Sequence, residues 1–304
     1  MKKNWHLICI TLIICLALAA CSKQTVVGSK IKNGTVSKLG KLAKEEMQNV
    51  TDQVAREKAE AEAAKQAEAQ AKKEHETAGI QVPKVEAIPG QHRDPNSAVV
   101  VIDPGHQLRG DSTKEPNGPG SSTMKARVTS GTTGVTTKVA EYIMNLNVSL
   151  KLKTELENRG YTVYMTRTTH DVNISNKERA EYATSVGADI AVRIHGNGST
   201  NSSVHGVEAY APSYNNPYVG HLAKASQSLS RCIVDGYSVA TGFKNRGVFT
   251  SDTMTGINWS TVPVTIIELG YMSNAEEDRN MQDETIQNNM VQGIANGIDK
   301  YFGF

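Results

Sequence analysis

Three strand-like apolar runs in the second part of the chain each end in a side chain that can bind a metal ion or a proton. These runs span residues 99–106, 188–195 and 264–268, and they end in His106, His195 and Glu268. The runs are rich in β-branched residues, which favour strands. Because ligands bind at the carboxyl ends of parallel strands, we expect the three side chains to meet at one edge of a sheet.

Strand-like and helix-like patterns alternate from residue 98 onward. Strands are expected at 98–103, 161–167, 188–195, 207–211, near 248 and at 264–268, and helices at about 136–159, 175–187, 219–238 and 284–301. The apolar faces of the first and last helices are expected at Val139, Ile143, Leu146, Leu150 and Leu156, and at Ile286, Met290, Ile294 and Ile298. This alternation predicts a single α/β domain over 98–304, with a mostly parallel, twisted sheet and helices on both faces.

Two local patterns refine this outline. Ser175 and Glu178 have the spacing of a capping box, which starts a helix. Residues 107–136 are rich in Gly, Ser and Thr and are expected to form a long loop beside the strand-end residues.

The N-terminus has the pattern of a secretory signal. Lys2 and Lys3 precede a short apolar core, and two alanines stand immediately before Cys21. This resembles a bacterial lipobox, which implies a signal peptide over 1–20, cleavage before Cys21 and lipid attachment to its sulfur. An uncleaved N-terminal anchor is the alternative. Both place the remainder outside the cytoplasmic membrane.

Composition argues against nucleic-acid binding and against an intrachain disulfide. Removal of the leader leaves 31 basic and 31 acidic residues, so the balance of charge gives no support for nucleic-acid binding. With Cys21 lipidated, Cys232 is the one cysteine left, so the mature chain has no intrachain disulfide.

Residues 21–97 are expected to separate the lipid anchor from the folded domain. Residues 41–76 are rich in Ala, Glu and Lys, which favours helix, but almost lack the leucine and isoleucine of a coiled-coil seam. We interpret them as a semi-rigid helical spacer; the less favoured alternative is a helix that binds a regulatory protein. Three prolines in 79–97 indicate a linker.

The strand-end residues have the chemistry of a hydrolytic zinc site. Such a site needs three protein ligands and an open position for water. His106 and His195 supply two, and one carboxylate, Glu141 or Glu268, supplies the third and leaves the other as general base. Charge balance alone does not decide between them. Glu141 could instead interact with the dipole of its helix, and Glu268 could pair with an arginine or cap a helix.

An ordered set of motifs extends the pattern across the domain. These motifs are Val101-Ile-Asp-Pro-Gly-His106, Glu141-Tyr-Ile-Met-Asn-Leu-Asn, Thr166-Arg-Thr, Glu178-Arg-Ala, Arg193-Ile-His-Gly-Asn197 and Ile267-Glu-Leu-Gly-Tyr-Met-Ser-Asn274. Over residues 98–304 the chain resembles the zinc-dependent N-acetylmuramoyl-L-alanine amidases of the amidase-3 type.

The resemblance implies one Zn²⁺ held by His106, Glu141 and His195, with Glu268 as the catalytic glutamate. It implies peptidoglycan as substrate and cleavage of the amide between N-acetylmuramic acid and L-alanine. The chain departs from the family at Gln107, where many members have glycine, and at Gly196, where many have Ser or Ala. Neither departure removes a ligand.

Two other functions fit the same residues. One is a catalytically silent wall-binding or activator module, and the other is a zinc carboxypeptidase or deacetylase acting on peptidoglycan. Arg193 and Asn197 flank His195 and are candidates for substrate binding, with a structural role as the alternative. Trp259 and Tyr271 are candidates for a glycan groove, with core packing as the alternative.

Overall fold

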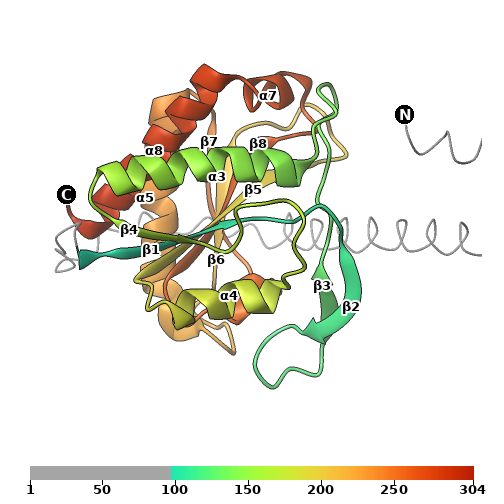
Figure 1. The fold of residues 1–304 in the computed structure, drawn as a ribbon, viewed down its shortest axis with the longest axis vertical. Coiled ribbons are helices and arrows are strands. Elements are labelled where there is room, and N and C mark those ends of the chain that lie inside the picture. Colours follow the sequence, from blue (N-terminus) through green and yellow to red (C-terminus); the bar gives the residue numbers. More distant parts are fainter. Residues whose placement is uncertain (1–96) are drawn as a thin grey trace, which may run out of the picture. The chain divides into compact units, whose positions relative to one another are not determined.

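The computed structural model describes residues 97–304, which form an α/β domain (Figure 1). Its six-stranded sheet has the order β4-β1-β5-β8-β6-β7. These strands are β4 (Thr162–Met165), β1 (Val99–Pro104), β5 (Ile190–Asn197), β8 (Val264–Tyr271), β6 (Val207–Ala211) and β7 (Asn245–Thr250). Every neighbouring pair is parallel except β6 and β8, which are antiparallel. The predicted mostly parallel sheet is confirmed.

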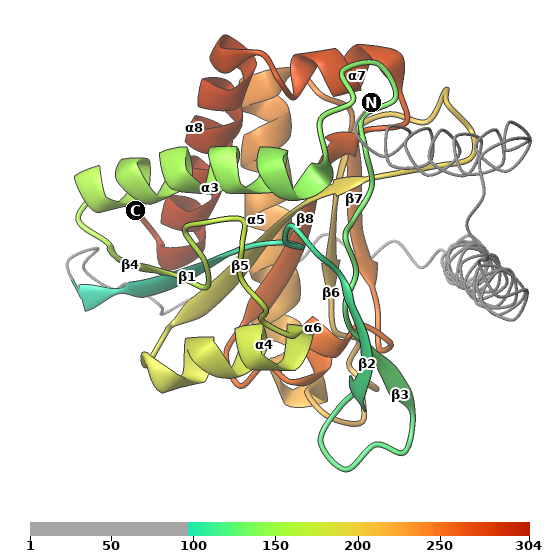
Figure 2. The same cartoon turned by 45° about the vertical axis from the view of Figure 1, so that its right-hand side comes forward.

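Helices cover both faces of this sheet (Figures 1 and 2). One face carries α3 (Glu141–Asn158), α5 (Ala223–Thr241) and α8 (Glu284–Phe302), and the other carries α4 (Asn176–Ser185) and α6 (Thr255–Asn258). The remaining helical segments are η2 (Gly220–Leu222) and α7 (Ala275–Asn280). Among residues 97–304, none of the helices is both long and apolar enough to cross a membrane.

The larger core lies under α3, α5 and α8. On α8, Met290, Ile294 and Ile298 are completely buried and Ile286 is partly buried, which confirms the predicted apolar face. α5 and α8 approach closely because both carry glycine at their contact. A Cβ atom on Gly297 would lie 2.4 Å from the Cα of Ile233, a distance that no packed side chain tolerates.

The predicted apolar face of α3 is only partly correct. Leu146 and Leu156 are buried, but Leu150 is 39% exposed. The buried face is rotated toward Val148 and Leu152, and it also includes the polar Asn145 and Ser149, both 0% exposed. These inward polar residues conceal the 3.6-residue period, and the leucines alone therefore indicate the wrong stripe.

The start of α4 confirms the capping box. The Oγ of Ser175 accepts a hydrogen bond from the backbone N–H of Glu178, and the Glu178 carboxylate accepts one from the N–H of Ser175. Two otherwise unpaired donors of the first helical turn are thereby satisfied.

Residues 107–136 are not a loop throughout, contrary to the prediction. They contain an antiparallel hairpin of β2 (Asp111–Pro116) and β3 (Met124–Val128) that stands apart from the main sheet (Figure 2). Contacts with α4 hold it: Glu115 accepts a hydrogen bond from the N–H of Lys177, and Arg127 pairs with Glu178. The exposed, polar sequence of β2 lacks the apolar alternation by which half-buried strands are predicted.

The predicted signal peptide (1–20), the lipidation of Cys21 and nearly all of the spacer and linker (21–97) lie outside the described residues.

Candidate active site

The carboxyl ends of β1, β5 and β8 bring the three predicted strand-end residues to one edge of the sheet. His106 follows β1, His195 lies near the end of β5, and Glu268 lies in β8 directly beside His195 in the parallel register. Glu141, the first residue of α3, is 3% exposed and points at both histidines.

Three donor atoms converge between β1, β5 and α3. The Oε1 atom of Glu141 lies 3.1 Å from Nε2 of His106 and 3.2 Å from Nδ1 of His195. The two imidazole rings meet edge to face, with centroids 4.8 Å apart. Donors about 2.1 Å from a tetrahedral zinc ion lie about 3.4 Å from each other, so the two contacts with Glu141 have nearly the spacing that one ion requires.

The protonation of the ligands also fits a metal ion. The Nδ1–H of His106 donates to the carbonyl of Thr129 at 2.9 Å, which leaves the lone pair of Nε2 facing Glu141. Burial lowers the pKa of His195 to about 4, and its imidazole is therefore neutral at pH 7. Burial opposes ionisation of Glu141, but the two histidines hold its pKa well below the ordinary value. Burial opposes protonation of His106, but Glu141 raises its pKa. The close donors therefore favour a shared cation, which a proton or a metal ion can supply, and two imidazoles with a carboxylate suit zinc.

Backbone groups from several segments fix Glu141. Its Oε2 accepts the N–H of Thr132 at 2.8 Å, and its Oε1 accepts the N–H of Gly196 at 3.1 Å. Gly131 approaches so closely that a Cβ atom there would lie 2.6 Å from Oε2, and its φ of +76° is one that glycine adopts readily. Gly105 is restricted in the same way, since a Cβ atom would lie 2.2 Å from the ring of His195.

Arg193 does not point toward the donor cluster. Its side chain is 5% exposed, its Nε donates to Asp103 at 2.7 Å, and Nη2 donates to Asn176. Asp103 also binds Arg179, which in turn donates to the carbonyl of His106 at 3.1 Å. These contacts favour the structural alternative for Arg193: it helps to hold the segment that presents His106.

Asn197 belongs to a hydrogen-bonded cluster that sequence reasoning missed. Its Nδ2 donates to Glu208, which is 3% exposed and lies opposite Glu268 on the neighbouring strand β6. Tyr210 and Tyr271 also donate to Glu208, at 2.7 and 2.8 Å. The sequence feature that could have revealed this cluster is the single carboxylate, Glu208, within the apolar run of residues 207–211, because a buried charge requires partners.

Glu268 is electrostatically coupled to the same tyrosines. Burial, followed by the charge of Glu208 and then that of Glu268, raises the pKa of Tyr210 well above its ordinary value. Tyr271 is affected by the same two carboxylates. Both hydroxyls therefore stay protonated and keep their hydrogen bonds to Glu208.

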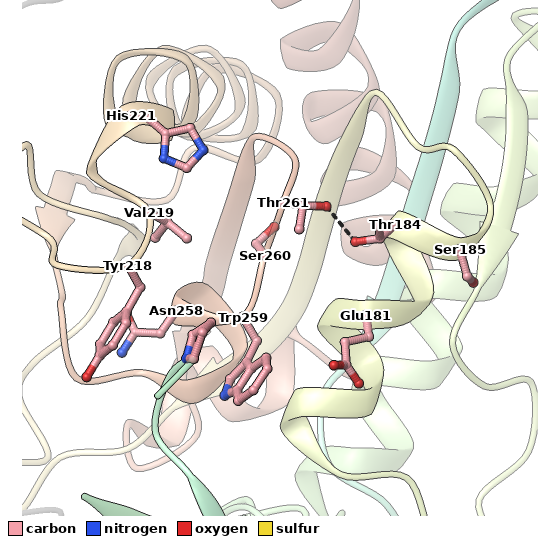
Figure 3. A pocket seen from close by; sticks show the side chains of 11 residues that line it. Glu181, Thr184, Ser185, Tyr218, Val219, His221, Asn258, Trp259, Ser260 and Thr261 are labelled. Carbon is pink, nitrogen blue, oxygen red and sulfur yellow. Dashed lines mark hydrogen bonds between the residues drawn. The ribbon is translucent and has the colours of Figure 1, made fainter. Parts of the chain in front are cut away.

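Trp259 and Tyr271 do not form one aromatic groove. Trp259 lines a cavity of about 520 Å³ between α4 and α6, together with Tyr218, Glu181 and His221 (Figure 3). Its Nε1 donates to the carbonyl of Pro116, whereas Tyr271 is buried beside Glu208. The cavity adjoins residues that precede β8, and the donor cluster lies at the opposite, carboxyl end of that strand.

Comparison with known proteins places this domain in one family. The Amidase_3 family, described as N-acetylmuramoyl-L-alanine amidase, matches residues 100–300. The chain is 26% identical over 203 residues to the N-acetylmuramoyl-L-alanine amidase LytC of Bacillus subtilis, covering 67% of this chain and 35% of LytC. It is 25% identical over 205 residues to the probable cell wall amidase LytH of Staphylococcus epidermidis, covering 67% and 58%. The chain thus spans about a third to three-fifths of these relatives.

Solved structures show the same fold. The catalytic domain of CwlV, an N-acetylmuramoyl-L-alanine amidase from Bacillus (Paenibacillus) polymyxa, is 30% identical with a TM-score of 0.54, covering 67% of this chain and 97% of that domain. The apo form of the amidase Ami1 from Mycobacterium abscessus is 25% identical with a TM-score of 0.61, covering 67% and 98%.

Proposed function

We propose that this chain, which belongs to the Amidase_3 family of N-acetylmuramoyl-L-alanine amidases, hydrolyses the amide that joins N-acetylmuramic acid to L-alanine of the peptidoglycan stem. The observation that carries the proposal is the convergence of His106, Glu141 and His195 on one point, with Glu268 on the adjoining strand. The family match supports the same reaction.

His106, Glu141 and His195 would hold a zinc ion. When bound there, zinc lowers the pKa of water and polarises a substrate carbonyl. Two neutral imidazoles and one carboxylate leave such a site with a net positive charge. The hydrogen bonds from Thr132 and Gly196 hold the Glu141 carboxylate in place, and this preserves the spacing of the donors.

Glu268 would act as the general base and acid. It takes a proton from the attacking water and delivers that proton to the nitrogen that leaves with L-alanine. Its place beside His195 in the strand register puts a carboxylate next to the donor cluster without making it part of that cluster.

The matched pair Glu268→Gln and Glu141→Gln tests this assignment. Glu268→Gln keeps the side-chain shape, so we expect about one zinc ion per chain and turnover on peptidoglycan reduced by at least about 10²-fold. Glu141→Gln removes the anionic ligand and should lose zinc, as should His106→Ala and His195→Ala. Metal content is measured after chelator treatment and zinc restoration. An active Glu268→Gln, or loss of zinc from it while Glu141→Gln keeps zinc, refutes the two roles.

Product analysis tests the reaction itself. Digestion of purified peptidoglycan should release new amino ends on L-alanine. New reducing sugars alone, new carboxyl ends within the stem, or free acetate would contradict the proposal. The absence of any product from a zinc-loaded preparation would favour a silent wall-binding module.

We also propose that the mature protein is anchored to the outer side of the bacterial cell membrane by lipid on Cys21, with residues 21–97 as spacer. The order of basic residues, apolar core and alanines before Cys21 supports this. Cys21→Ser should abolish incorporation of radiolabelled palmitate, and incorporation that persists would refute the anchor. Binding of a regulatory protein by residues 41–76 is the less favoured alternative to a spacer role.

A further inference from the structure

Arg246 is held beside the active site by a feature built into β7. Val207 of β6 pairs with Asn245 and Glu208 pairs with Gly247, so Arg246 has no opposite residue and forms a bulge. Gly247 supports the bulge with a φ of +95°. Bulges next to active sites redirect a side chain, and here the guanidinium carbon of Arg246 lies 5.3 Å from the ring centroid of Tyr271, on β8.

Glu208 anchors one edge of this guanidinium. The Nε of Arg246 donates to Oε2 of Glu208 at 2.7 Å, and the same oxygen accepts the hydroxyl of Tyr271. Asn197 and Tyr210 donate hydrogen bonds to the other carboxylate oxygen of Glu208, Oε1. Four donors from four strands therefore fix Glu208, which in turn fixes the direction of Arg246.

The other edge of the guanidinium is open. Within residues 97–304, the structure gives Nη1 and Nη2 of Arg246 no hydrogen bond, and the side chain is 28% exposed. An arginine that is oriented by one carboxylate, partly exposed, and without a hydrogen bond on its Nη groups in the described domain can bind a second planar anion through paired hydrogen bonds.

Strand spacing sets the distance from this edge to the reaction. Glu208 lies opposite Glu268 in the antiparallel register, and neighbouring strands are about 4.8 Å apart. Arg246 donates to the carboxylate of Glu208 at 2.7 Å, and that strand position lies one strand spacing from Glu268, so the guanidinium is roughly 5 to 10 Å from the general base. An extended peptide advances about 3.5 Å per residue. Two residues beyond the scissile amide would span about 7 Å, which lies within this range.

We propose that Arg246 binds a carboxylate of the stem peptide on the residue that follows L-alanine, and that it makes the enzyme prefer the free acid over its carboxamide. This inference rests on the proposed amidase function. Because Glu208 already balances the charge of Arg246, the preference comes from hydrogen-bond geometry. A carboxylate accepts two N–H groups, whereas a carboxamide turns its own NH₂ donor toward one of them.

The test compares two synthetic muramoyl peptides that differ only at this group, one with a free carboxylate and one with a carboxamide. Wild type should favour the acid in kcat/KM by about 10- to 100-fold, the range for paired hydrogen bonds to a charged group, with most of the difference in KM. Arg246→Met should remove the preference by weakening cleavage of the acid alone. Lys244→Gln, which removes an exposed positive charge two residues away, should keep the preference.

The outcomes separate this inference from the proposed function. Equal kcat/KM for both peptides in wild type, or an unchanged preference in Arg246→Met, overturns the role of Arg246 and leaves amidase activity established. A loss of preference in Lys244→Gln as large as in Arg246→Met also overturns it, because the general electrostatic attraction of nearby positive charges would then explain the effect. Cleavage of neither peptide by zinc-loaded wild type overturns both proposals.

Thermal midpoint and zinc content verify that Arg246→Met is folded. If it is not, Arg246→Lys replaces it. Lysine keeps the positive charge but lacks the planar pair of N–H donors of the guanidinium, so the preference in kcat/KM for the acid should fall at least about 5-fold. A preference that survives intact in Arg246→Lys would overturn the proposal.

Discussion

Asp103 is the residue whose replacement should most damage the domain without touching a ligand. Its carboxylate is 3% exposed and accepts hydrogen bonds from Arg179 and Arg193 at 2.7 Å each. The side chains of these arginines are 0% and 5% exposed. Their other partners in the described domain are carbonyl and amide oxygens. Asp103→Asn therefore leaves two buried cations without a counter-charge.

Removal of one partner from a buried ion pair destabilises a protein by about 3–5 kcal/mol. For a domain of this size, each kcal/mol lowers Tm by about 2–4 °C, so Asp103→Asn should lower Tm by about 6–20 °C. Thermal and urea unfolding of the chelator-treated chain measure this without a contribution from metal. Glu181→Gln is the control, because Glu181 pairs with Lys177 at the surface at 3.7 Å and should change Tm by no more than about 2 °C.

The effect should also depend on pH in one direction. Burial opposes the charge of Asp103, but Arg179 and Arg193 hold its pKa well below the ordinary value of 3.8. A depressed pKa stabilises the folded state above the unfolded pKa, and this stabilisation is lost as pH falls below it. The difference between wild type and Asp103→Asn should be constant above about pH 5 and shrink below about pH 4. A loss below about 1 kcal/mol, or a difference that grows in acid, refutes the reasoning.

Two further substitutions test the packing with matched controls. Gly131→Ala places a Cβ atom 2.6 Å from Glu141 and should weaken zinc binding by about 10- to 100-fold in a chelator competition. Gly120→Ala is the control, because Gly120 has a similar φ but nothing within 4 Å, and it should leave zinc binding unchanged. Equal zinc affinity in both variants would contradict this. Leu152→Ala should cost about 2–5 kcal/mol in urea unfolding because Leu152 is completely buried, while Leu150→Ala should cost at most about 0.5; the reverse order would restore the face predicted from sequence.

The strands and the edge at which they end could be predicted because their signals are local. A run of β-branched residues that ends in His106 or His195 contains both the strand and the ligand. The face of α8 was predictable for the same reason, since Met290, Ile294 and Ile298 repeat at helical spacing with no buried polar residue directly between them in the stripe. In α3, by contrast, buried Asn145 binds the carbonyl of Gly105, and this inward polar contact is invisible to a pattern of apolar residues.

Side-chain direction at the strand ends could not be predicted from alternation. Arg193 and His195 are two residues apart, so strand alternation alone would put them on one face, but Arg193 turns to Asp103, while His195 contacts Glu141. The strand register is regular from Arg193 to His195, and its irregularity lies beyond them, so the partners of each side chain account for the difference in direction. The ion pair between Arg193 and Asp103 joins β5 and β1. These two residues are 90 positions apart, so no local sequence pattern predicts their contact.

The orientation of the ligands depends on segments that contain no ligand. The backbone of residues 129–132 receives the Nδ1–H of His106 and donates to Glu141, and its glycine allows the close approach. These contacts come from backbone groups, so they depend on the path of the chain, which the contacts of Glu115 and Arg127 with α4 help to set. The candidate ligands can therefore be recognised in the sequence, whereas the geometry that brings them together depends on the path of residues 107–136, where the sequence pattern is least regular.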